Sequence, residues 1–127
     1  MKFLLVVTML MASTVFAKVK SEVVDYKEGE NALQGFRYYD SAILAKKKKL
    51  PGVVIVHDWM GVGDNVKMRG EELAKLGYVA FVADIYGKGV HPKDAKEAGA
   101  LAGKFKAGDR KDLRARATAA FNVLAND

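Results

Sequence analysis

Four consecutive β-branched residues at positions 53–56, Val-Val-Ile-Val, constrain the fold of this chain more than any other feature. Pro51 and Gly52 precede this run, and polar and aromatic residues replace the aliphatic ones directly after it. Apolar side chains at successive positions are typical of a strand that is buried on both faces of a parallel sheet. The run therefore predicts a central parallel strand.

A helix and a second strand are expected to follow this first strand. Asp64 can cap the start of a helix over residues 65–76, and Gly77 would end it. The apolar face of this helix would comprise Val66, Gly70, Leu73 and Ala74. Residues 78–82 form a second, mostly apolar run. A strand, helix and strand of this length pack as a parallel pair with a right-handed crossover, so the fold class is α/β.

The rest of the chain adds a hairpin before this unit and two helices after it. Residues 22–26 and 32–39 are strand-like runs separated by a turn with Gly and Asn, which predicts an N-terminal β-hairpin. Pro92 suits the first turn of a helix that Gly108 would end, and Asp109 can cap a final helix. The expected apolar faces of these two helices are Ala95, Ala98, Ala102 and Phe105 in the first, and Leu113, Ala117, Ala120, Phe121 and Leu124 in the second.

Residues 1–17 have the layout of a secretory signal peptide. Lys2 precedes an apolar run over residues 3–11, and Val15 and Ala17 suit the positions three and one before a cleavage site. The apolar run is shorter than the roughly 20 residues that a membrane-spanning helix needs. We therefore expect cleavage after Ala17, a secreted or periplasmic location, and one domain over residues 18–127 that does not contact the membrane.

The composition excludes several classes of function. With 50% hydrophobic and 28% charged residues, the chain is typical of a folded globular domain. It has no cysteine, hence no disulfide and no thiol ligand. The two histidines, His57 and His91, have no helical partner at metal-ligand spacing, so we expect neither a metal nor another cofactor. The lysine run at residues 46–49 is interpreted as a solvated loop before Pro51 and not as a nucleic-acid contact.

Candidate site residues follow the two predicted parallel strands. His57, Asp58 and Trp59 come after the first strand, and Asp84 and Tyr86 follow the second. Ligands of open α/β sheets bind beyond the carboxyl ends of the strands, so these side chains are expected at one site. Trp59 and Tyr86 would wall a pocket or close the top of the core, and the pocket is favoured for Trp59. Asp84 is expected to fix the loop that follows it.

Three segments of the chain, residues 51–61, 73–80 and 83–89, resemble the front half of dienelactone hydrolase family proteins. The resemblance implies a partial α/β-hydrolase fold and an enzyme that acts on the ester or lactone bonds of a small molecule. It also implies that the backbone N–H of Trp59 is an oxyanion-hole donor. Asp58 takes the position at which many members carry a glutamate that contacts the resting nucleophile; the alternative is a carboxylate that caps the turn. His57 and Trp59 are the candidate substrate-binding residues, and His57 is alternatively a hydrogen-bonded structural residue.

The family's nucleophile, usually a cysteine, is expected on a strand after the last predicted helix, followed by an acid and a histidine. Neither Gly-x-Ser-x-Gly nor Gly-x-Cys-x-Gly occurs in the 127 residues, so the resemblance predicts an incomplete domain that lacks the catalytic triad. It also implies that the strand at residues 53–56 lies between the strand at residues 78–82 and the nucleophile-bearing strand, so without the latter it is expected to be an open edge. One alternative is a secreted, truncated hydrolase-like module without catalytic activity. Another is dinucleotide binding through Gly61 and Gly63, although the third glycine of that fingerprint is missing.

Overall fold

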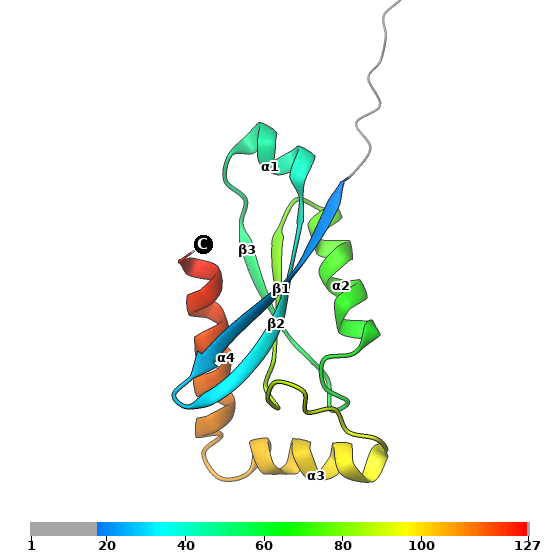
Figure 1. The fold of residues 1–127 in the computed structure, drawn as a ribbon, viewed down its shortest axis with the longest axis vertical. Coiled ribbons are helices and arrows are strands. Elements are labelled where there is room, and N and C mark those ends of the chain that lie inside the picture. Colours follow the sequence, from blue (N-terminus) through cyan, green and yellow to red (C-terminus); the bar gives the residue numbers. More distant parts are fainter. Residues whose placement is uncertain (1–17, 127) are drawn as a thin grey trace, which may run out of the picture.

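A computed structural model describes residues 18–126 of the chain as one four-stranded sheet with four helices (Figure 1). The predicted signal peptide lies outside the described residues. In chain order the elements are β1 (Val19–Glu28), β2 (Asn31–Asp40), α1 (Ser41–Lys47), β3 (Gly52–Val56), α2 (Asp64–Lys75), β4 (Val79–Ala83), α3 (Ala95–Lys106) and α4 (Lys111–Ala125). The strand order in the sheet is β1-β2-β4-β3. The prediction of an α/β fold with a hairpin, a parallel strand–helix–strand unit and two further helices is confirmed.

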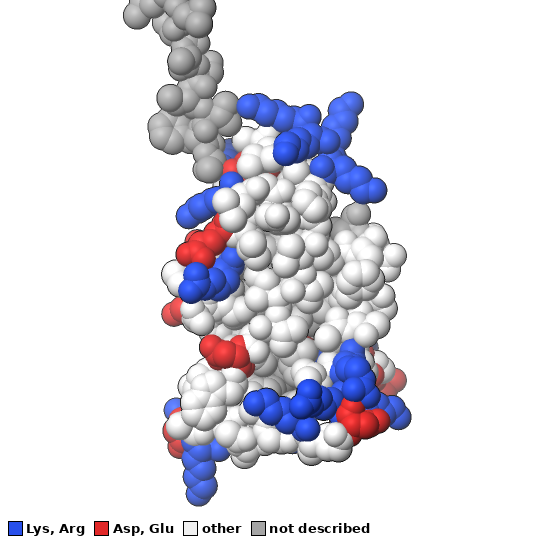
Figure 2. All heavy atoms as spheres, turned by 180° about the vertical axis from the view of Figure 1, so that it is seen from behind, with Lys and Arg blue, Asp and Glu red and all other residues white. Residues whose placement is uncertain are grey.

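Helix α1 was not predicted; it includes Lys46 and Lys47, whereas Lys48 and Lys49 follow it as the exposed segment before Pro51 that the sequence indicated. The Asp40 carboxylate caps the helix by accepting hydrogen bonds from the backbone N–H groups of Ala42 (2.8 Å) and Ile43 (3.0 Å). The helix ends at Lys48, whose backbone is left-handed (φ 60°). Lys46 and Lys47 therefore occupy the last helical turn, where positive charge is favourable. Figure 2 shows basic side chains gathered at this end of the molecule.

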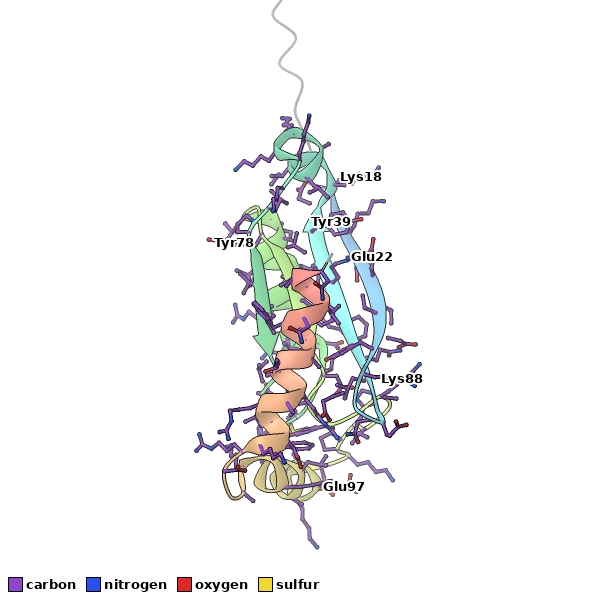
Figure 3. The ribbon with its side chains drawn as sticks, turned by 90° about the vertical axis from the view of Figure 1, so that its left-hand side faces the viewer. Lys18, Glu22, Tyr39, Tyr78, Lys88 and Glu97 are labelled. Carbon is purple, nitrogen blue, oxygen red and sulfur yellow. The ribbon has the colours of Figure 1, made fainter. Side chains whose placement is uncertain are left out.

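The hairpin is longer than predicted, because β1 and β2 pair over ten positions, from Val19 opposite Asp40 to Glu28 opposite Asn31. A salt bridge at the turn end ties the hairpin to the loop after β4. There Lys88 Nζ lies 2.6 Å from Asp25 Oδ2, and Figure 3 shows Lys88 beside this end of the hairpin.

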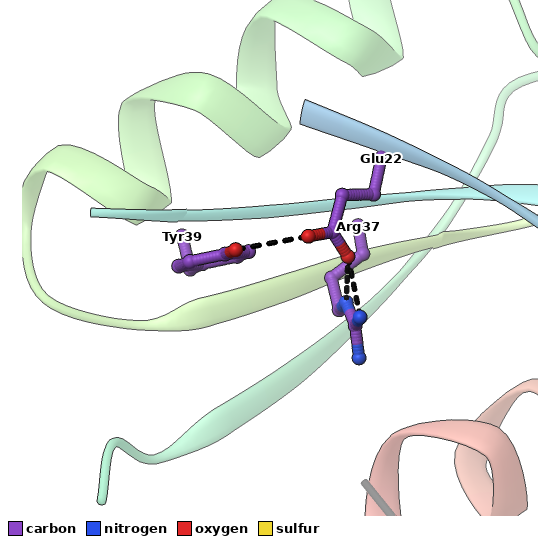
Figure 4. A network of polar contacts seen from close by, with 3 residues as sticks. All are labelled: Glu22, Arg37 and Tyr39. Carbon is purple, nitrogen blue, oxygen red and sulfur yellow. Dashed lines mark hydrogen bonds and ion pairs between the residues drawn. The ribbon is translucent and has the colours of Figure 1, made fainter. Parts of the chain in front are cut away.

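A polar network joins the two hairpin strands near their other end (Figure 4). Glu22 lies directly opposite Arg37, which donates hydrogen bonds from Nε (2.9 Å) and Nη2 to Glu22 Oε2. Tyr39 donates its hydroxyl proton to Glu22 Oε1 (2.9 Å). The hydrogen bond from Arg37, more than that from Tyr39, holds the pKa of Glu22 below its usual value of 4.5. The network fixes the hairpin register through side chains as well as through the backbone.

The parallel unit is built as predicted, from β3, α2 and β4. The two strands pair from Gly52 opposite Val79 to Val56 opposite Ala83. Helix α2 presents its buried residues Val66, Gly70 and Ala74 to the sheet. A Cβ atom on Gly70 would lie 2.5 Å from the Tyr38 ring, so only glycine allows the helix to approach the sheet this closely.

Two details of this unit differ from the prediction. The N-cap of α2 is Gly63 and not Asp64, which is the first helical residue. The second is the place of β3, which is an edge strand because only β4 pairs with it among the described residues; the apolar run alone predicted a central strand, whereas the family resemblance predicted this open edge. Val56 is 49% exposed, whereas residues 80–83 of β4 are fully buried. A run of β-branched apolar residues indicates a strand, but it does not determine whether a neighbouring strand covers both edges.

Helices α2 and α4 cover opposite faces of the sheet. Ala80 and Val82 of β4 pack in the cluster that contains α2, whereas the alternating residues Phe81 and Ala83 pack with Ala120 of α4. Helix α3 lies at the carboxyl ends of the parallel strands β3 and β4 (Figure 1). No helix within residues 18–126 has the length and apolar character that crossing a membrane requires.

The predicted starts and faces of α3 and α4 are partly wrong. Helix α3 is capped by Asp94, which accepts a hydrogen bond from the N–H of Glu97, and Pro92 lies before the helix. Helix α4 begins after Arg110, although Asp109 Oδ1 does accept a hydrogen bond from the N–H of Lys111 (3.0 Å). The predicted core residue Phe121 is 60% exposed, because it lies to one side of the face that packs on the sheet.

We expect the domain to self-associate through β3, since this strand has a hydrogen-bonding partner on one side only within residues 18–126. Val56→Lys places a charge on the open edge and should lower the association constant measured by sedimentation velocity. Met68→Lys is the matched control, because Met68 lies on α2 and is similarly exposed (46%). A strictly monomeric parent chain, or an equal effect of both substitutions, would contradict this expectation.

Candidate active site

A pocket of about 280 Å³ lies at the carboxyl ends of β3 and β4. The loop after β3 contributes His57, Asp58 and Trp59 to its lining, and the loop after β4 contributes Ile85 and Tyr86. Helices α3 and α4 close the other side with mostly apolar side chains. The sequence-predicted residues from both strand ends, except Asp84, therefore line one pocket.

His57 is almost buried, and its two ring nitrogens both contact backbone groups. Nε2 accepts a hydrogen bond from the N–H of Ile85 (3.1 Å), and Nδ1 lies 2.7 Å from the carbonyl oxygen of Asp58. Because Nε2 is an acceptor, the proton must be on Nδ1, which donates to that carbonyl. The ring also packs edge-to-face on Tyr86, with 4.7 Å between the centroids. His57 thus joins the loops after the two parallel strands.

The turn after β3 is held by Asp58. Its Oδ1 accepts a hydrogen bond from the N–H of Met60 (2.8 Å), and its carbonyl oxygen accepts one from the N–H of Gly61 (3.1 Å). Asp58 Oδ2 lies 3.5 Å from Asn65 Nδ2. The carboxylate therefore caps the turn, as one of the two interpretations of the sequence stated. Gly61, a residue of the alternative dinucleotide motif, has a φ of 85° and serves the same turn.

Trp59 stands at the rim of the pocket, with its side chain 49% exposed. Its carbonyl oxygen accepts a hydrogen bond from the Tyr86 hydroxyl (2.8 Å). Its N–H has no hydrogen-bond acceptor in the part of the chain that the structure describes, whereas the N–H groups of Met60 and Gly61 both have one. Burial, reinforced by the charge of Asp58, raises the pKa of Tyr86, so this hydroxyl stays a donor at neutral pH.

Asp84 does not line this pocket but fixes the loop after β4. Its Oδ1 accepts a hydrogen bond from the N–H of Gly87 (2.9 Å), and its Oδ2 accepts one from the N–H of Gln34 (3.1 Å). The Tyr26 hydroxyl accepts a hydrogen bond from the N–H of Asp84 (2.9 Å). These contacts confirm the prediction that Asp84 has a structural role. Burial raises the pKa of Tyr26 to about 12.

Arg116 of α4 supports the site and was missed in the sequence. It is buried, and its Nη1 donates a hydrogen bond to the carbonyl oxygen of Ile85 (2.7 Å). The guanidinium lies 4.9 Å from the centroid of the Phe105 ring, which stacks on Tyr86. Its spacing was a usable signal, because Arg116 falls four residues before Ala120 on the buried face of the helix. Within residues 18–126, no group of three or more His, Cys, Asp or Glu side chains is placed to hold a metal ion.

The fold and the strand-end pocket define an α/β protein with a site in the position where enzymes of this class bind their ligands. The model of the dienelactone hydrolase family matches residues 40–127. The chain therefore belongs to the dienelactone hydrolase family. A comparison with curated proteins gives no match.

Two solved structures resemble the chain closely. One, named m3DLH, is 28% identical with a TM-score of 0.75 over 86% of this chain. The other, a dienelactone hydrolase-like promiscuous phosphotriesterase from metagenomic libraries, is 31% identical with a TM-score of 0.73 over 85% of this chain. The match covers 44% of the first protein and 43% of the second. The chain thus spans about half the length of these two proteins.

Arg116→Met should lower the free energy of unfolding by about 1.5–3 kcal/mol, because the buried Ile85 carbonyl loses a charged donor. Arg114→Met is the matched control two residues away. Arg114 is 65% exposed with its guanidinium 3.8 Å from Asp109, and its loss should cost less than about 0.5 kcal/mol. Urea denaturation of both variants measures the difference. Similar values for the two variants would contradict the role given to Arg116.

Tyr26→Phe should also destabilise the domain, by about 1–3 kcal/mol, because it removes the acceptor for the buried N–H of Asp84. The pKa of Tyr26 rises on folding from 10.0 to about 12, so its contribution is complete below pH 10 and is lost as the pH rises towards 12. The difference in unfolding free energy between the parent chain and the variant should therefore narrow over this range. A difference that stays constant up to pH 12 would show that the buried hydroxyl is not the cause.

Proposed function

We propose that this chain supplies one part of the active site of a hydrolase that acts on ester or lactone bonds of a small molecule. The part is the loop after β3, with an oxyanion donor and a wall of the substrate pocket. The observation that carries the proposal is the N–H of Trp59, which has no acceptor among the described residues and belongs to a residue that lines the strand-end pocket. Membership of the dienelactone hydrolase family supports the same reaction class.

The chemistry follows from where negative charge develops during ester hydrolysis. Attack on the carbonyl carbon moves an electron pair onto the carbonyl oxygen, and a preorganised N–H donor stabilises that oxyanion by about 2.7–4 kcal/mol. Trp59 would supply one such donor. The indole of Trp59 and the ring face of His57 would contact the apolar part of the substrate, and Tyr86 lines the same pocket.

Asp58 has one carboxylate oxygen that is weakly engaged. Oδ1 is held by the N–H of Met60, whereas Oδ2 has only the contact of 3.5 Å with Asn65. In the proposed enzyme, Asp58 Oδ2 contacts the resting nucleophile. Capping the turn and contacting the nucleophile are therefore compatible, because they use different oxygens.

The nucleophile, acid and histidine are proposed to lie outside these 127 residues. This is supported by the absence of Gly-x-Cys-x-Gly and Gly-x-Ser-x-Gly from the sequence, and by the relatives being more than twice the matched length. The alternative is a secreted hydrolase-like module without catalytic activity. The hydrolase and the non-catalytic module would both carry the expected export signal.

The 127-residue chain should show no saturable turnover of p-nitrophenyl acetate above buffer, because an oxyanion donor without a nucleophile forms no oxyanion. Reading the DNA past the codon for Asp127 should reveal a nucleophile elbow, and the longer product should hydrolyse the ester until the elbow residue is changed to Ala. Turnover by the 127-residue chain that is lost on changing Asp58 would show that the site is placed wrongly. Absence of an elbow would favour the non-catalytic module.

Export is proposed on the layout of residues 1–17 alone. Amino-terminal sequencing of the protein from a bacterial periplasm or culture medium should give Lys18 as the first residue. Recovery of the intact amino terminus from the cytoplasm would contradict the proposed location.

A further inference from the structure

We propose that His57 is the positioning residue of the oxyanion donor: its Nδ1–H holds the Asp58 carbonyl and thereby directs the N–H of Trp59. The inference rests on the proposed function, which makes that N–H a catalytic donor. It assigns His57 a second role, in addition to the substrate contact proposed above.

The first step of the argument is the peptide group itself. The carbonyl of Asp58 and the N–H of Trp59 belong to the same planar unit, and no cis peptide bond occurs among the described residues. In a trans peptide the C=O and N–H bonds point in opposite directions. Any group that fixes the direction of the Asp58 carbonyl therefore fixes the direction of the Trp59 N–H.

The second step is that this carbonyl is held twice. It accepts hydrogen bonds from His57 Nδ1 (2.7 Å) and from the N–H of Gly61 (3.1 Å). The carbonyl of Trp59 is held as well, by the Tyr86 hydroxyl (2.8 Å). Both peptide groups of Trp59 are thus restrained through their carbonyls, while its N–H has no partner among residues 18–126.

The third step is that the His57 ring cannot turn freely. The N–H of Ile85 donates to Nε2 (3.1 Å), His57 as a whole is 9% exposed, and Tyr86 packs against its ring. The Ile85 hydrogen bond requires a lone pair on Nε2 and so keeps the proton on Nδ1. With both nitrogens engaged, His57 has no free site for proton transfer, and its role is to orient the backbone.

Two substitutions separate the two nitrogens of His57. In His57→Asn the side-chain amide is placed near the position of Nδ1 and can still donate to the Asp58 carbonyl. In His57→Gln the amide reaches the position of Nε2 and can still accept from Ile85, but the donor to Asp58 is lost. If His57 has a purely structural role, the orientation of the Trp59 N–H should change in whichever variant is less stable. If His57 is a positioning residue, the orientation should be kept in His57→Asn, which retains the donor to Asp58, and lost in His57→Gln.

The experiment uses the ¹⁵N-labelled 127-residue chain at a concentration where it is monomeric. Residual dipolar couplings give the orientation of the Trp59 N–H bond, and ¹⁵N shifts of the imidazole give the tautomer of His57. Titration with phenylphosphonate, a tetrahedral anion with an apolar ring, tests whether the N–H binds an oxyanion. We expect a downfield shift of the Trp59 amide proton in the parent chain and in His57→Asn, and loss of both the shift and the N–H orientation in His57→Gln.

The possible failures are distinguishable. An unchanged N–H orientation in His57→Gln overturns the positioning role. A reoriented N–H in that variant, together with no phenylphosphonate response in the parent chain, supports the positioning of the peptide and overturns the oxyanion function. If His57→Gln does not fold, the tautomer in the parent chain decides, because a proton on Nε2 is incompatible with the proposal and a proton on Nδ1 supports it.

Discussion

The hydrogen bond from the N–H of Ile85 to His57 Nε2 joins the loops that follow the two parallel strands. The backbone pairing of β3 and β4 ends at Val56 and Ala83. Beyond these residues, side-chain hydrogen bonds must hold the two loops next to each other. This bond sets the tautomer of His57, which in turn holds the Asp58 carbonyl. Arg116 secures the other side of the same residue through the Ile85 carbonyl. The shape of the pocket thus depends on the backbone of Ile85, which is held by His57 of the loop after β3 and by Arg116 of α4.

Much of the fold could be predicted from the sequence, because local patterns determine the parallel unit. The apolar run of β3, the amphipathic spacing in α2 and the glycine after it each specify an element without reference to distant residues. The prediction failed where tertiary context decides. The edge position of β3 followed from the family resemblance but not from its apolar run, because pairing partners come from distant segments, as the β2–β4 pair about 45 residues apart shows. Helix α1 was missed because a short helix with four lysines near its end resembles a solvated loop.

The position of the site could be predicted from the sequence, whereas the hydrogen bonds between its residues could not. His57, Asp58 and Trp59 were expected close to Tyr86, because the carboxyl ends of parallel strands lie at the same edge of the sheet. The hydrogen bonds that give these residues separate tasks run between loops, and no spacing in the sequence encodes them. Arg116 was missed for a different reason: its spacing from Ala120 placed it on the buried face of the helix, but an arginine on a helix is usually at the surface.

The close approach of α2 to the sheet at Gly70 has a consequence for how this protein tolerates mutation. A side chain at this position would meet the ring of Tyr38 and lift the helix. The turn that carries Trp59 leads directly into the amino-terminal end of α2. A displacement of this helix would therefore also move Trp59 at the pocket rim. Libraries of variants screened for altered substrate preference should therefore find Gly70 sensitive, although no residue of α2 is among those that line the strand-end pocket. Directed evolution of this scaffold would gain more from randomising the rim while leaving this glycine untouched.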